Sequence, residues 1–192
     1  MKEQIQSFIE ESIKTKQSLI GDEKILTGIE KAINLVSDSL KNQGKVMVFG
    51  NGGSAADAQH FAGEIVGRYK RERRGYPAIA LTTDTSIITS VANDYSFDAI
   101  FSRQIEALGK KGDIAFGIST SGNSKNVIEG IKKAKELGIS TICLLGKDGG
   151  KLKDLAELSI VIPSDNIPRI QETHILIIHI ICEEVEKNLD NL

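Results

Sequence analysis

Apolar stretches of strand length alternate with stretches of helical pattern from residue 45 to the end of this 192-residue chain. The expected strands are runs of mainly Val, Ile, Leu and other apolar residues, and they cover 46–49, 78–82, 114–118, 140–145 and 158–162. The expected helices cover 54–68, 85–108, 124–137, 151–156 and 168–189. Such alternation is typical of a mostly parallel sheet with helices on both faces. We therefore expect an α/β fold, a doubly wound three-layer sandwich, with ligands bound at the carboxyl ends of the strands.

Two further helices are expected ahead of the first strand. Residues 2–20 and 25–40 both place apolar residues at helical spacing, and a Gly-Asp pair separates them. A simple doubly wound sheet does not need these helices, so their apolar stripes must be covered by each other or by another subunit. We favour a subunit contact, and we expect residues 1–43 to form a helical extension and 44–192 to form one structural unit.

The charge balance argues against a nucleic-acid partner. The formal net charge is -2, and the 40% hydrophobic and 26% charged residues are ordinary for a soluble α/β protein. Binding to a nucleic-acid backbone draws on a broad basic surface, because much of the affinity comes from counterion release. We expect no such partner.

No segment has the pattern of an export signal or a membrane span. The N-terminus, MKEQIQSFIEES, carries acidic residues where a signal peptide has a basic and then an apolar stretch. The densest apolar run, Ile175–Cys182, is far shorter than the ~20 residues of a spanning helix and is interrupted by His179. We expect a cytoplasmic chain in which Cys143 and Cys182 are buried free thiols.

A loop of small residues, Gly50–Ser54, joins the first strand to a helix that carries His60 and Glu64. Free N–H groups and the positive end of the dipole at a helix start attract phosphate. His60 and Glu64 are four residues apart and share one helix face, about 6 Å apart, so acid/base or metal chemistry would lie near that phosphate. The pair alone is equally consistent with a surface ion pair. The loop also fits the dinucleotide fingerprint G-x-G-x-x-A, but Asp84 lies too far along the chain to be its acidic partner.

A second loop of this kind follows the strand at 114–118. Its sequence, STSGNS at 119–124, places four hydroxyl groups beside the backbone amides at a helix start. A structural N-cap at Asn123 or Ser124 accounts for one hydroxyl but not for four. Clustered hydroxyls and N–H groups bind phosphate monoesters without a lysine, so we favour a phosphate site here.

Two basic or histidine-bearing segments are ambiguous by themselves. KRERRG at 70–75 is most simply a solvated loop, although Arg68 just before it could reach a phosphate. In the last helix, His179 lies within the run ILIIHIIC, and a histidine so placed is more often a hydrogen-bonded core residue than a catalyst.

Taken together, the glycine-rich loop followed by HFAGE, the ISTSGNS loop and RIQETH with a downstream histidine resemble the phosphoheptose isomerases of the sugar-isomerase (SIS) superfamily. The resemblance covers nearly the whole chain. It implies a SIS-type fold and a cytoplasmic homotetramer with sites near the subunit interfaces. It also implies that sedoheptulose 7-phosphate is converted to D-glycero-D-manno-heptose 7-phosphate through an enediolate, the entry to bacterial surface heptose synthesis, including that of lipopolysaccharide.

The resemblance also assigns residues. It implies Glu64 and His179 as catalytic groups, and one Zn²⁺ per subunit held by His60, Glu64, Gln171 and His179. Its implied substrate contacts, to which we add Ser54, Glu64 and Arg68 from the pattern of the chain, are Asn51, Gly52, Gly53, Asn93, Asp94, Ser119, Thr120, Ser121, Ser124 and Gln171.

One alternative and one difficulty stay open. A non-catalytic SIS protein, either phosphosugar-binding or replication-initiator-associating, shares the scaffold. The replication-initiator-associating relative lacks the glutamate and the C-terminal histidine. Gln171 and His179 are eight residues apart, or about 12 Å in an ideal helix, which only long, converging side chains could span.

Overall fold

The computed structural model describes residues 1–189 and has the expected α/β architecture, with a parallel sheet of five strands in the order β2-β1-β3-β4-β5. Each neighbouring pair of strands is parallel. The strands are β1 (Val46–Gly50), β2 (Ala78–Ala80), β3 (Ile114–Ser119), β4 (Ser140–Gly146) and β5 (Leu158–Ile162). β2 is shorter than expected because the chain leaves the sheet in a turn after Ala80.

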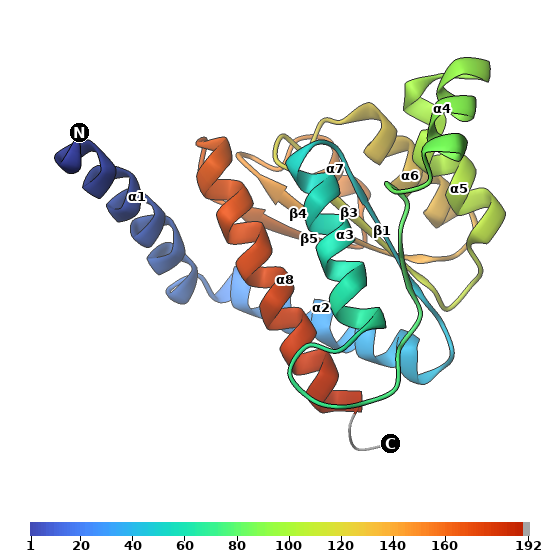
Figure 1. Cartoon of the computed structure of the whole chain (residues 1–192), viewed down its shortest axis with the longest axis horizontal. Coiled ribbons are helices and arrows are strands. Elements are labelled where there is room, and N and C mark those ends of the chain that lie inside the picture. The colour runs from blue at the N-terminus through green and yellow to red at the C-terminus, as the bar shows by residue number, and fades with distance from the viewer. Residues whose placement is uncertain (190–192) are drawn as a thin grey trace.

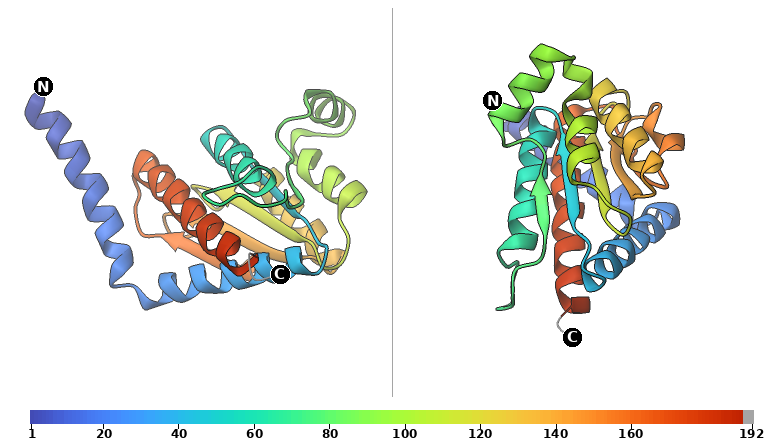
Figure 2. Two further views of the ribbon diagram at one scale, coloured as in Figure 1. Left: turned by 60° about the horizontal axis from the view of Figure 1, so that its bottom comes forward. Right: turned by 90° about the vertical axis from the view of Figure 1, so that its right-hand side faces the viewer.

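Helices cover both faces of the sheet, as Figures 1 and 2 show. One layer contains α2 (Glu23–Lys41), α3 (Gly53–Val66) and α8 (Ile167–Leu189). The other contains α4 (Thr85–Asp94), the 3-10 helix η1 (Phe97–Ala99), α5 (Ile100–Leu108), α6 (Lys125–Glu136) and α7 (Leu152–Leu155). The helical stretch expected at 85–108 is therefore divided, because Ser96 has an extended backbone with φ -167°.

Alternate residues of the buried strands pack into two separate cores. In β1, Val46 and Val48 join the core under α2, α3 and α8, whereas Met47 and Phe49 join the core under α5 and α6. The period of two residues in a strand sends successive side chains to opposite faces. Because both faces are covered, every position of β1 is buried and the strand is continuously apolar.

The two N-terminal helices have different surroundings. α2 packs on the sheet and on α8, and its apolar residues Ile29 and Val36 are buried. The expectation that its stripe needs another subunit is therefore wrong for α2, because β5 and α8 already cover that stripe. α1 (Lys2–Ile20) projects away from the sheet (Figure 2), and Phe8 and Ile9 remain 53% and 56% exposed. The assignment of 1–43 as an oligomer contact stays a prediction.

Both cysteines are free and buried, as expected, and burial raises the pKa of each thiol. Within residues 1–189, no helix is both long and apolar enough to cross a membrane.

Candidate active site

α3 and α8 lie side by side and run in the same direction from the carboxyl edge of the sheet (Figure 1). At the start of the two helices, the Gln171 side chain lies against Gly53 so closely that a Cβ on Gly53 would be 2.3 Å from Nε2 of Gln171. Two turns further along, His179 of α8 faces His60 of α3. Because the two helices are parallel, residues at the same height along their axes lie side by side. Gln171 and His179 therefore contact different turns of α3.

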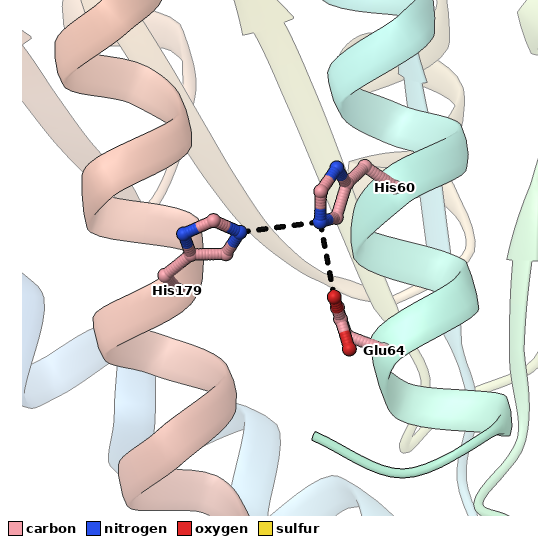
Figure 3. Close-up of side chains that lie close together, drawn as sticks. All are labelled: His60, Glu64 and His179. Atoms are coloured by element: carbon pink, nitrogen blue, oxygen red, sulfur yellow. Dashed lines mark hydrogen bonds and ion pairs between the residues drawn. The ribbon is translucent and has the colours of Figure 1, made fainter. Parts of the chain in front are cut away.

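His60, Glu64 and His179 form a cluster between these helices (Figure 3). The Nε2 atom of His60 lies 3.0 Å from Oε1 of Glu64 and 3.1 Å from Nε2 of His179. One ligand atom from each residue lies within 4.8 Å of the other two. The pair spaced four residues apart is therefore part of a three-residue group and is not an isolated surface pair.

The donor set of this cluster fits a metal ion. Two imidazole nitrogens and a carboxylate oxygen are ordinary Zn²⁺ ligands. A tetrahedral ion with bonds of about 2.0 to 2.1 Å holds its ligand atoms roughly 3.3 Å apart, close to the separations of His60 from Glu64 and from His179. A proton on Nε2 of His60 cannot serve both neighbours well, whereas one cation placed among the three atoms serves all of them.

The cluster is accessible from solvent and is bordered by an aromatic ring. The His60 side chain is 45% exposed and the Glu64 side chain 25% exposed. The ring centroids of Tyr69 and His179 lie 5.7 Å apart. A small polar molecule can therefore reach the cluster.

The core role considered for His179 is taken instead by His174, whose Nε2 lies 3.0 Å from the Leu145 carbonyl oxygen, and burial lowers the pKa of His174 to about 4.

The first loop turns at Gly52, whose φ of 56° and ψ of -121° are open to glycine and costly for other residues. Gly52 is the N-cap of α3, and no side chain within residues 1–189 caps this helix. By contrast, the carboxylates of Asp22 and Asp84 cap α2 and α4. The N–H groups of Ser54 and Ala55 donate to backbone carbonyl oxygens of the loop, whereas those of Gly52 and Gly53 have no hydrogen-bond partner among the described residues and stay available for an anion.

The second loop, 119–124, leads into α6, whose first N–H groups, those of Lys125 and Asn126, have no hydrogen-bond partner among the described residues. Ser124 is the N-cap residue by position, but its hydroxyl makes no capping hydrogen bond and lies 3.0 Å from the hydroxyl of Ser119. The loop turns at Gly122, with φ 63°, where a Cβ would lie 1.9 Å from the carbonyl oxygen of Gly149. Close packing against the segment after β4 therefore fixes the shape of this loop.

Three expected contacts come from outside the two loops and the His60, Glu64 and His179 cluster. Arg68 lies beyond the carboxyl end of α3, opposite the end that begins at the first loop, and its Nε atom is 3.6 Å from Oε2 of Glu72. Asn93 and Asp94 end α4, on the other face of the sheet from α8, and the Asn93 amide donates to Asp94. Their contacts with substrate stay predictions.

Two polar residues at the site were not singled out from the sequence. Asn126, in the first turn of α6, exchanges two hydrogen bonds of 2.8 Å with Asn51 and so joins the two loops. Asp57 lies one turn before His60, and its Oδ2 atom is buried with no hydrogen-bond partner among the described residues. Burial raises the pKa of Asp57 to about 6, an effect that His60 opposes. The helical spacing of Asp57 to His60 was a usable indication, whereas only the fold reveals Asn126.

Known proteins share the sequence and the fold of this chain. The SIS domain family model matches residues 7–146. A phosphoheptose isomerase of Geobacter sulfurreducens is 59% identical over 175 residues, which are 91% of this chain and 93% of that protein. The phosphoheptose isomerase structure from Neisseria gonorrhoeae has a TM-score of 0.89 at 44% identity, covering 97% of this chain and 98% of the other. A Francisella tularensis phosphoheptose isomerase structure has a TM-score of 0.92 at 38% identity, covering 96% and 97%. The two open loops and the His-Glu-His cluster thus lie in a chain that belongs to the phosphoheptose isomerases of the SIS domain family.

Proposed function

We propose that this protein interconverts sedoheptulose 7-phosphate and D-glycero-D-manno-heptose 7-phosphate through an enediolate. The observation that carries the proposal is the cluster formed by His60 and Glu64 of α3 with His179 of α8, about two turns along from the loop at which α3 begins. The names of the relatives support a phosphorylated heptose as the substrate class, and the geometry of the cluster supports its isomerisation.

The length of the substrate fits the distance between the two parts of the site. His60 follows Gly53 by seven residues, which is about 10 Å along the axis of α3. An extended seven-carbon chain with its terminal phosphate ester spans roughly 10 Å, given carbon-carbon bonds of about 1.5 Å. A phosphate held at the loops therefore places C1 and C2 at the cluster.

Glu64 and His179 divide the proton transfers of the reaction. Oε1 of Glu64 faces His60, and the other carboxylate oxygen points away from it (Figure 3), free to take the proton from one carbon and return it to the next. His179 donates to and accepts from the substrate oxygens, which must exchange a proton in the same step. Each such group typically contributes about 10² to 10⁴-fold in rate.

His60, Glu64 and His179 would hold one Zn²⁺ per subunit, with Gln171 as the fourth ligand that the family resemblance implies. A bound ion would polarise the carbonyl and hydroxyl oxygens of the substrate. Gln171 reaches the ion only if its side chain turns from Gly53, where it now lies, toward the turn that carries His60. Glu64 serves as ligand through one oxygen and as base through the other.

The two loops bind the phosphate and the distal hydroxyls. Backbone N–H groups at the starts of α3 and α6, with the side chains of the two loops, surround a dianion. The residues assigned to this role are Asn51, Gly52, Gly53, Ser54, Ser119, Thr120, Ser121 and Ser124. Further contacts from Arg68, Asn93 and Asp94 belong to the same proposal.

The exposed apolar residues of α1 support a homo-oligomer, with a tetramer as the family expectation. Sedimentation of a stable monomer at micromolar concentration would refute this. We assign the enzyme to the cytoplasm, where its product would enter surface heptose synthesis for lipopolysaccharide, capsule or another glycan.

A non-catalytic binding role is not favoured, because Glu64 and His179 are both present and face the same cluster. Incubation with sedoheptulose 7-phosphate in D₂O, followed by NMR, tests the enzyme directly. We expect the aldose to form and to carry solvent deuterium at the exchanged carbon. Failure to form any aldose would overturn the proposed activity.

A further inference from the structure

Glu186, two turns after His179 on α8, has a carboxylate that is almost fully buried and surrounded by donors. It accepts hydrogen bonds from the backbone N–H groups of Tyr69, Lys70 and Arg71, at 3.0, 2.8 and 2.9 Å. It also accepts one from Nε of Arg73 at 3.0 Å. Burial alone opposes ionisation, but these donors outweigh it and lower the pKa of Glu186. The segment that follows α3 is thus fastened to α8 by a charged group.

Arg73, the partner of Glu186, caps the end of α3. Its side chain is 6% exposed. Nη2 donates to the carbonyl oxygen of Glu64 at 2.9 Å, and Nη1 donates to those of Ile65 and Gly67 at 3.0 Å each. The last carbonyl groups of a helix have no partner within it, so the guanidinium supplies the missing donors. α3 has no basic residue of its own in its last turn.

The two residues therefore act on the turn that carries Glu64. Arg73 bonds the backbone of Glu64 itself, and Glu186 lies on the same helix as His179. The ion pair between Arg73 and Glu186, which we call the clamp, thus joins the backbone of Glu64 to the helix that carries His179. The segment anchored by Glu186 passes the end of α8 (Figure 1) and also brings Tyr69 against the His179 ring.

We propose that Arg73 and Glu186 are positioning residues that set the separation of Glu64 from His179 and hold Tyr69 against His179. This inference rests on the proposed isomerase function for its kinetic consequences. A displacement of about 1 Å in a catalytic group can cost about 10²-fold in rate. Neither residue is among the proposed substrate contacts, so its loss should affect turnover and metal binding more than substrate affinity.

A neighbouring ion pair provides a matched control. Lys70 and Glu183 join the same segment to the same helix, with Nζ 2.8 Å from Oε2. The Lys70 side chain is 59% exposed, and no contact joins the pair to the α3 carbonyl groups in the part of the chain that the structure describes. Exposed pairs contribute little to stability, so Glu183→Gln should behave as the wild type.

The test compares Glu186→Gln and Arg73→Lys with Glu183→Gln and the wild type. In the first two we expect kcat to fall about tenfold or more, KM to change less than about threefold, and Zn²⁺ affinity to weaken about tenfold, as is usual for residues that support metal ligands. The visible spectrum of the Co²⁺-substituted proteins should also shift, because the ligand geometry changes. Zn²⁺ affinity and the Co²⁺ spectrum are measured without substrate, so they report on positioning even if the wild type proves inactive as an isomerase.

Folding is checked by circular dichroism and urea unfolding. Should both clamp variants fail to fold, Tyr69→Leu, which leaves Arg73 and Glu186 intact, is expected to lower kcat about threefold or more with KM little changed. Wild-type kcat, KM, Zn²⁺ affinity and Co²⁺ spectrum in the folded clamp variants, with only lower stability, would overturn the proposal. If the clamp variants do not fold, unchanged kinetics in Tyr69→Leu would also overturn the proposal.

Discussion

Asn51 and Asn126 exchange two hydrogen bonds of 2.8 Å between their side-chain amides. Asn51 belongs to the first loop and Asn126 to the first turn of α6, so this one pair fixes the distance between the two open helix starts. Oδ1 of Asn126 also accepts from the N–H group of Val127. The two halves of the proposed phosphate site are therefore held together before any ligand binds.

The amide pair should be visible as an energetic coupling. Asn51→Ala and Asn126→Ala each leave the other amide without its partner, at a cost of about 1 to 3 kcal/mol in the free energy of unfolding. The double variant should cost less than the sum of the single variants, by about 1 kcal/mol or more. A double-mutant cycle from urea unfolding measures this, and additive effects would contradict the coupling.

Glu64→Gln should preserve the shape of the site and remove its base. We expect kcat to fall at least about 10²-fold, because the amide cannot take the carbon proton. Binding of inorganic phosphate, measured by calorimetry, should remain near that of the wild type. Glu136→Gln is the control, because the Glu136 side chain is 63% exposed and pairs with Lys133 in the last turn of α6. Near-normal turnover in Glu64→Gln would remove Glu64 from the base role.

Replacement of both Ser121 and Ser124 by alanine should raise KM more than it lowers kcat. The phosphate is remote from the reacting carbons, so these hydroxyls hold it equally in the ground and transition states. Steady-state kinetics would show the division, with Ser102→Ala on α5 as a control, since the Ser102 hydroxyl donates only to the Ala99 carbonyl oxygen among the described contacts. A defect mainly in kcat would count against the phosphate role.

Removal of divalent metal should lower turnover, and Zn²⁺ should restore it. The His60, Glu64 and His179 atoms lie at separations that suit a metal ion, which would polarise the substrate oxygens. The measurement is activity against metal content by elemental analysis, with protein dialysed without chelator as the control. Full activity in metal-free protein would leave His60 as a hydrogen-bonding residue.

Asp57→Asn should change how stability depends on pH. Burial raises the pKa of Asp57 from 3.8 to about 6, so the folded state holds a proton that the unfolded state releases between these values. The tighter proton binding of the folded state adds to the free energy of unfolding below about pH 4, and this contribution is lost as the pH rises through about 6. The neutral variant avoids the loss, and should gain about 1 to 2 kcal/mol relative to the wild type between pH 4.5 and 7.5, after allowance for solvent screening.

Urea unfolding at the two pH values, with chelator present, measures that gain. Glu136→Gln serves again as a control for an exposed carboxylate. Parallel pH profiles for Asp57→Asn and the wild type would show that the Asp57 carboxylate is not destabilised in the folded state.

Local pattern in the sequence was enough to predict the layers of the fold. The continuous apolar runs become the buried strands β1, β3 and β4, because a strand covered on both faces needs apolar side chains at every position. The glycine at residue 52 marked a turn that other residues adopt only at a cost, and the spacing of His60 and Glu64 placed both on one face of α3.

Only the tertiary structure decided which distant residues meet. The position of α8 along its axis relative to α3 brings His179 to His60 and Gln171 to Gly53, and no periodicity within either helix encodes that alignment. Asn126 and Glu186 are polar residues on amphipathic helices, and only their hydrogen-bond partners distinguish them from solvated neighbours. Those partners lie 75 residues away in the sequence for Asn126 and 113 to 117 residues away for Glu186. A sequence pattern reports the period of one element, whereas such contacts depend on the packing of several elements at once.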